Sequence, residues 1–137
     1  MRAVPEGPTN RPVKITKNKA SDGAPEWSPD GTQLAFHSHP NTGVPEIFRM
    51  KAAPQSRDNR PVNLSKSSGY DYYPTWSPDG RQIAFQSDRS GNKEIWRVRA
   101  TGGANPTNLT NNPALDEDPS WQPLAAAAGP STQGGTG

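Results

Sequence analysis

Apolar residues along this chain fall in short runs in which they alternate with polar or small residues. In the run QLAFHS, Leu34 and Phe36 share one face, and in QIAFQS, Ile83 and Phe85 do the same. Side chains that alternate with a period of two are typical of β-strands. No segment keeps the 3.6-residue period of an amphipathic helix, so the pattern predicts an all-β chain.

These runs repeat in one phase along the chain. The string WSPDG occurs twice, and three tryptophans follow one another at intervals of 49 and 45 residues, namely Trp27, Trp76 and Trp121. An aliphatic residue precedes each tryptophan by 12 positions in all three cases: Ile15, Leu64 and Leu109. The strings EIFRM and EIWRV recur 48 residues apart. Three independent markers in one phase indicate an internal repeat.

Each repeat unit predicts four short strands. The first, PEW or PTW, ends at Ser-Pro-Asp-Gly, where Asp-Gly favours the positive φ of a tight hairpin. The second and third are the QLAFHS and EIFRM type runs, and PVNLS or PTNLT supplies the fourth. Four-stranded units of about 45 residues are typical of β-propeller blades, which pack face to face. The small Ala35 and Ala84 would allow the next layer to approach closely.

The second unit resembles a known repeat. Residues 74–96, PTWSPDGRQIAFQSDRSGNKEIW, are similar almost throughout to the TolB-type, WD40-like β-propeller repeat. The first unit is a looser copy, since its second turn reads HPNTGVP where the family favours Ser-Asp-Arg-x-Gly. The resemblance covers roughly residues 12–123 and implies a β-propeller. Propellers of this kind occur in periplasmic binding proteins of a cell-envelope complex, beside the catalytic domain of prolyl-oligopeptidase-like enzymes, and in some pectate-degrading lyases.

The phase of the repeat predicts too few blades for a closed ring. Full four-stranded antiparallel blades are expected at about residues 25–65 and 74–110, with single strands of the flanking blades at 12–18 and 119–122. Closed propellers have typically 4–8 blades. We therefore expect a partial β-propeller. It could be a segment of a longer propeller, a homo-oligomer whose copies complete a ring, or an open two-blade stack, and the surplus single strands favour the segment.

Composition narrows the class of protein further. The chain has no cysteine, which excludes disulfides and thiolate metal sites, and its net charge is +2 without a basic stripe for nucleic acid. No apolar run reaches membrane-spanning length, and residues 1–11 lack the apolar segment of a secretory signal. We expect residues 1–11 and the low-complexity tail, residues 124–137, to be disordered.

The loop GYDYYP is the preferred contact point for a partner. It adds Tyr70, Tyr72 and Tyr73 to the repeat, whereas the corresponding loops SDGAP and DEDP contain no aromatic residue. Clustered exposed tyrosines are enriched at binding surfaces. The alternative is that the tyrosines pack over their own blade.

Asp22, Asp71 and Asp116 form a second candidate set, because each lies five residues before a repeated tryptophan. A ring of carboxylates near a propeller axis could bind a cation or a basic peptide. The simpler interpretation, which we favour, is a turn in which each carboxylate accepts local backbone hydrogen bonds.

The other repeated residues are explained by the fold. The three tryptophans are predicted to lie in the core between blades, and Asp30 and Asp79 to form hairpin turns. His37 and His39 could supply two metal ligands, but the chain has no other histidine and no cysteine. We therefore expect neither a metal nor another cofactor.

No nucleophile elbow, phosphate loop or triad-like grouping is present in the sequence, so an enzyme is not expected. The sequence predicts a non-enzymatic propeller scaffold or protein-binding module with a protein partner. The alternative is the propeller segment of a prolyl-oligopeptidase-like peptidase or a propeller lyase whose catalytic residues lie outside this chain. The resemblance implies a periplasmic or extracellular location.

Overall fold

The computed structural model describes residues 14–41, 43–53, 60–102 and 105–122. The two segments expected to be disordered, residues 1–11 and 124–137, lie outside the described residues. The first sheet contains β1 (Ser21–Trp27), β2 (Gln33–His39), β3 (Glu46–Lys51) and β4 (Val62–Asn63). The second contains β5 (Asp71–Trp76), β6 (Gln82–Ser87), β7 (Glu94–Arg99) and β8 (Thr107–Asn108).

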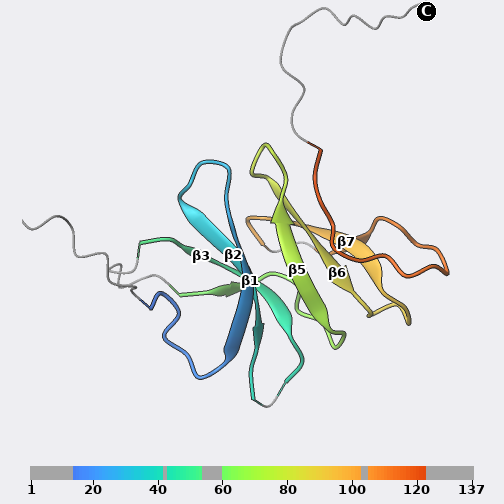
Figure 1. Ribbon diagram of the computed structural model, residues 1–137, viewed down its shortest axis with the longest axis horizontal. Helices are drawn as coiled ribbons and strands as arrows, with labels where there is room; N and C mark the ends of the chain where they lie inside the picture. The colour runs from blue at the N-terminus through green and yellow to red at the C-terminus, as the bar shows by residue number, and fades with distance from the viewer. Residues whose placement is uncertain (1–13, 42, 54–59, 103–104, 123–137) are drawn as a thin grey trace, which may run out of the picture.

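Each sheet is antiparallel, and its strands are adjacent in the order in which they occur in the sequence, β1-β2-β3-β4 and β5-β6-β7-β8. Figure 1 shows the two sheets side by side, and β5 packs against β1, β2 and β3. The predicted all-β partial propeller with two complete four-stranded blades is confirmed. No helix among the described residues is long and apolar enough to cross a membrane.

The innermost strand of each blade begins a few residues earlier than predicted, because its ladder continues past a β-bulge. In β1 the pairing runs from Ser21 opposite His39 to Trp27 opposite Leu34, with an irregularity between Gly23 and Glu26. The second blade has the same irregularity between Tyr72 and Thr75. Ala24 and Tyr73 take a positive φ at these bulges, a conformation that is uncommon for residues other than glycine.

The Ser-Pro-Asp-Gly segments form the predicted tight turns. Gly31 and Gly80 both have φ +72°, a region that glycine enters without steric cost. The Asp30 carboxylate accepts hydrogen bonds from the Ser28 hydroxyl at 2.7 Å and the Thr32 amide at 3.0 Å. These bonds, with that from Ser28 the largest, lower the pKa of Asp30 from its usual value. The aspartates of both turns therefore have a structural role.

Hydrogen bonds between the third and fourth strands explain the repeated EI and NL strings. The Asn63 side chain donates to the Glu46 carboxylate, and the Ile47 amide donates to the Ser65 hydroxyl at 2.9 Å. The second blade repeats both bonds with Glu94, Asn108, Ile95 and Thr110. Two-residue strands are held in place by these side chains as well as by their short ladders.

The core lies between the two blades and draws residues from both. Its buried members are Ala35, Ile47, Leu64, Trp76, Ile83, Phe85, Val98 and Ala100. The indole of Trp76 donates to the carbonyl of Glu26 at 3.1 Å, and the Arg49 guanidinium donates to the carbonyl of Ala100. Both faces of the second strand of each blade, β2 and β6, are largely buried, as expected for blades that pack face to face.

Residues 116–121 lie beside the second blade in the way that β5 lies beside the first blade. The Trp121 indole donates to the carbonyl of Thr75 at 2.9 Å, as Trp76 does to Glu26, and the Asp116 amide donates to the carbonyl of Lys93 at 2.8 Å. The described residues of both predicted flanking strands, 14–18 and 119–122, carry no strand assignment. A strand requires a neighbour, and no described strand pairs with either segment.

Repeat-equivalent residues differ in exposure at the two outer faces of the pair of blades. Trp76 is 7% exposed but Trp27 is 57% exposed, and Leu64 is 2% exposed but Leu109 is 46% exposed. The prediction that all three repeated tryptophans lie in a core is therefore wrong for Trp27. Its side chain occupies the face of β1 that no described blade covers.

Candidate functional site

The three tyrosines of the GYDYYP loop lie at the start of β5. Tyr70 precedes the strand and Tyr72 and Tyr73 belong to it. Tyr70 and Tyr73 are 49% and 45% exposed, whereas Tyr72 is half-buried. The positive φ of Tyr73 turns its side chain out at the bulge. The bulge thus presents aromatic rings at one end of the second blade.

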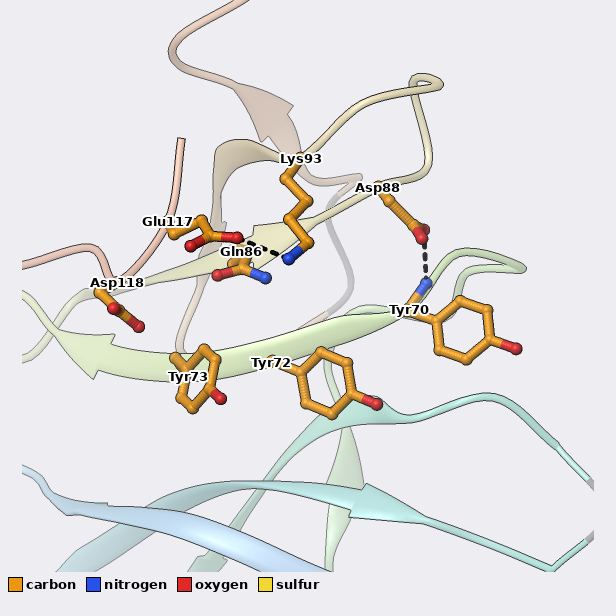
Figure 2. Close-up of a pocket in the computed structure, with 8 residues that line it drawn as sticks. All are labelled: Tyr70, Tyr72, Tyr73, Gln86, Asp88, Lys93, Glu117 and Asp118. Atoms are coloured by element: carbon orange, nitrogen blue, oxygen red, sulfur yellow. Dashed lines mark hydrogen bonds and ion pairs between the residues drawn. The ribbon is translucent and has the colours of Figure 1, made fainter. Parts of the chain in front are cut away.

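These tyrosines line a pocket of about 480 Å³, which we name the tyrosine pocket. Figure 2 shows Gln86, Asp88 and Lys93 of the same blade on one side and Glu117 and Asp118 of the C-terminal segment on another. Asp88 accepts a hydrogen bond from the Tyr70 amide at 2.8 Å, and Lys93 pairs with Glu117 at 2.5 Å. The pocket thus combines aromatic rings with carboxylates in a space of small-ligand size.

His37 of β2 packs against the tyrosines from the first blade. Its ring meets Tyr72 edge-on at 4.9 Å between centroids and Tyr73 at 5.9 Å. A Cβ on Gly23 would approach His37 Nε2 to 2.8 Å, so a larger residue here would require the ring to shift. His37 Nδ1 is buried and has no hydrogen-bond partner among the described residues. Tyr72 and Tyr73 therefore pack across the boundary between blades and not only over their own blade.

Burial lowers the pKa of His37 from its usual value of 6.5, while the nearby Asp22 carboxylate opposes the shift and His39 adds to it. The unfolded chain therefore takes up a proton at a higher pH than the folded chain. We expect the free energy of unfolding to fall as the pH drops below 6.5. Replacing His37 with glutamine, the residue of the equivalent position in the second blade, should remove most of this dependence in urea unfolding measured between about pH 7.5 and pH 5.5. An equally steep slope in the variant would contradict the assignment.

The three repeated aspartates lie apart from the lining of the tyrosine pocket. Each accepts a hydrogen bond from the side chain four residues earlier, so the local donors are side chains and not the expected backbone amides. These donors are Asn18 for Asp22, Ser67 for Asp71 and Asn112 for Asp116. Asp71 is fully buried and also pairs with Arg89 at 3.0 Å. The repeated aspartate therefore stabilises the loop that leads into the first strand through a local side-chain hydrogen bond.

Sequence reasoning did not select the polar residues that complete the tyrosine pocket. Gln86 occupies the repeat position of His37, which faces the first strand of the next blade, so an alignment of the two units could have indicated it. Glu117 and Asp118 belong to the acidic run 116–118 and occupy the repeat positions of Tyr72 and Tyr73. Their approach to β5 depends on contacts between blades, which a single unit does not reveal.

His37 and His39 differ in environment, since His37 is half-buried and His39 is exposed. Within the described ranges, no group of three or more histidine, aspartate or glutamate side chains could hold a metal ion. Of the carboxylates in the tyrosine pocket, that of Glu117 is already paired with Lys93.

A second pocket, of about 800 Å³, lies at the opposite end of the second blade. Arg81, Arg97 and Arg99 line it. The counterpart of Arg97 in the first blade is Arg49, which donates to backbone carbonyls of the neighbouring blade. We therefore interpret Arg97 as a residue of a blade boundary and this second pocket as part of the open outer face.

Comparison with known proteins supports the partial-propeller fold. A family model described as the TolB β-propeller domain matches residues 7–125. The solved structure of a protein described as TolB from Agrobacterium tumefaciens is 31% identical with a TM-score of 0.67, over 80% of this chain and 37% of that protein. TolB from Acinetobacter baumannii is 32% identical with a TM-score of 0.63, over 75% of this chain and 24% of that protein.

The chain therefore spans about a third of one of these structures and a quarter of the other. No curated protein sequence matches it.

Proposed function

Since the chain belongs to the TolB β-propeller domain family, we propose that it is a non-enzymatic scaffold that binds a protein partner through the tyrosine pocket. The observation that carries the proposal is the pair of exposed rings, Tyr70 and Tyr73, at a pocket of about 480 Å³. Tyrosine supplies a large contact area with little loss of side-chain entropy, and it is enriched among residues that dominate binding energy. The Tyr72 ring lies 5.8 Å from that of Tyr73 between centroids, and Asp71 at the start of β5 pairs with Arg89.

We further propose that these blades belong to a longer propeller. The exposed Trp27 and Leu109 are equivalent to residues buried at the boundary between the blades, so each outer face has the chemistry of a blade boundary. A ring of identical copies is the second candidate. It meets an obstacle, because residues 116–121 already lie where β1 of a following copy would pack.

The proposal places the protein in the periplasm or outside the cell, in line with the family that its repeat resembles. The competing function is the propeller domain of a peptidase or lyase with its catalytic residues elsewhere. Reading the coding DNA on both sides of this chain distinguishes the two, because an enzyme requires an adjacent catalytic region.

Binding by the tyrosine pocket is tested with the variant Tyr70→Ala/Tyr73→Asn. Asparagine at position 73 tolerates the positive φ of that residue, so the bulge is kept. Proteins retained by the immobilised chain from an envelope extract would be identified, purified and titrated by calorimetry. We expect the double variant to bind such a partner at least about tenfold more weakly.

The matched control is Val62→Ala, which removes an exposed apolar side chain of β4 outside the tyrosine pocket. Circular dichroism and urea unfolding show whether each variant keeps its fold. If the double variant binds the partner as tightly as the unaltered chain does, the tyrosine pocket is not the contact site.

A further inference from the structure

We propose that the tyrosine pocket recognises a cationic side chain of its partner and prefers the guanidinium of arginine. This inference rests on the proposed function and specifies the chemistry of that same site. The tyrosine pocket combines an excess of negative charge, a buried hydrogen-bond acceptor that lacks a donor, and two neighbouring tyrosine rings.

The charge of the tyrosine pocket is negative. Three carboxylates line it, those of Asp88, Glu117 and Asp118, against the single ammonium of Lys93. Lys93 is already paired with Glu117, and the Asp88 carboxylate accepts a hydrogen bond from the Tyr70 amide. Asp118 makes no hydrogen bond or ion pair with any residue that the structure describes. A cation placed here therefore meets a carboxylate that forms no hydrogen bond with any described residue and interacts with Lys93 only over a longer distance.

Gln86 provides an independent indication of a ligand. Its side chain lines the tyrosine pocket and is 4% exposed, yet its Oε1 has no hydrogen-bond donor within the described part of the chain. Figure 2 shows its amide beside Lys93 and Glu117. A buried acceptor without a donor is unfavourable, so a ligand that brings an N–H group gains from pairing with it. In the orientation that the structure gives this amide, Oε1 is the unpaired end and accepts a hydrogen bond from a donor.

The tyrosine rings favour arginine over lysine. The centroids of Tyr72 and Tyr73 lie 5.8 Å apart with their planes inclined at 37°, and Tyr73 is exposed. A guanidinium stacks flat on an aromatic face and still directs five N–H donors outward in its own plane. It can therefore contact a ring, the Asp118 carboxylate and Gln86 together, which a lysine ammonium does less well.

The chain already holds one of its own arginines in this way. The Arg89 guanidinium lies 5.3 Å from the Phe85 ring centroid and 4.8 Å from that of Trp96, and it pairs with Asp71 at 3.0 Å. The tyrosine pocket offers the same combination of rings and carboxylate, but with no cation between them other than Lys93.

The test uses two small probes of nearly the same shape, N-acetyl-arginine amide and N-acetyl-citrulline amide, in which a neutral urea replaces the guanidinium and its charge and additional N–H donors are lost. Each is titrated into the full, isotope-labelled chain while amide chemical shifts are followed by NMR. We expect the arginine probe to shift the amides of Tyr70, Gln86 and Asp118 saturably and to bind about tenfold more tightly than the citrulline probe. Equal affinity for both probes, or shifts confined to other surfaces, would overturn the inference.

Two charge-neutralising variants localise the effect. Asp118→Asn should weaken the arginine probe about threefold or more, and asparagine tolerates the positive φ of this exposed residue. The matched control Asp30→Asn removes one carboxylate from a turn at the other end of the first blade and should leave affinity unchanged. Equal losses in both variants would indicate a long-range charge effect and refute the assigned site.

The probe also separates this inference from the proposed function. If the tyrosine variant loses the protein partner while the arginine probe neither binds nor competes with that partner, cation recognition is wrong and the binding role stands. If the arginine probe binds the tyrosine pocket but the double tyrosine variant binds the partner as tightly as the unaltered chain does, the cation site stands and the proposed function fails.

Discussion

Replacing Asp71 with alanine is expected to lower the free energy of unfolding by about 3 kcal/mol or more. Asp71 is fully buried, and its Oδ2 accepts hydrogen bonds from Arg89 at 3.0 Å and from the Ser67 hydroxyl at 3.1 Å. The variant leaves the largely buried Arg89 guanidinium without its counter-ion and opens a small cavity. Urea unfolding followed by tryptophan fluorescence measures the loss.

Asp22→Ala is the matched control, because Asp22 holds the same repeat position in the first blade. It is half-buried and its side-chain donor is Asn18, while Pro40 stands at the position that Arg89 occupies in the second blade. We expect this variant to cost less than about 1 kcal/mol. Equal losses at Asp22 and Asp71 would mean that the ion pair contributes nothing beyond the local hydrogen bond.

The features that the sequence could predict are those that depend on residues within one repeat unit. Alternating apolar residues and the Asp-Gly turns specify strands and hairpins locally, so the two blades and the positive φ of Gly31 and Gly80 followed from the pattern. The repeated EI and NL strings indicated the phase, and the Glu46 to Asn63 hydrogen bond gives its reason. Such features depend on residues within one unit, which is why one sequence sufficed.

The remainder depends on how one blade meets the next. Asp22 and Asp71 are identical in the repeat, yet only Asp71 has an arginine at the facing turn. Of the residues that line the tyrosine pocket, the sequence predicts only Tyr70, Tyr72 and Tyr73 as binding residues. Glu117 and Asp118 reach the pocket because the Asp116 amide donates a hydrogen bond to the carbonyl of Lys93. The motif of Trp27 predicts a core position, but a tryptophan is buried only where another blade covers it.

The largest expected effect lies at the boundary between the blades. Trp76→Ala should cost about 3–5 kcal/mol, because it deletes a buried ring and its hydrogen bond to the Glu26 carbonyl. No described blade covers either outer face, so the protein has little stability to spare and the variant can lose its fold altogether. Trp76→Phe keeps most of the buried area and gives a smaller, measurable loss in the same direction.

Trp27→Ala is the matched control, since it removes the same side chain from the same motif at an uncovered face. We expect it to cost about 1 kcal/mol or less, as is usual for an exposed position. If it costs as much as Trp76→Ala, the outer face of β1 must be covered in solution, and sedimentation would show a mass above one chain. A small loss at Trp27 in a monomer would leave that face free for the blade of a longer propeller, because a tryptophan stabilises a propeller only through the blade that packs on it.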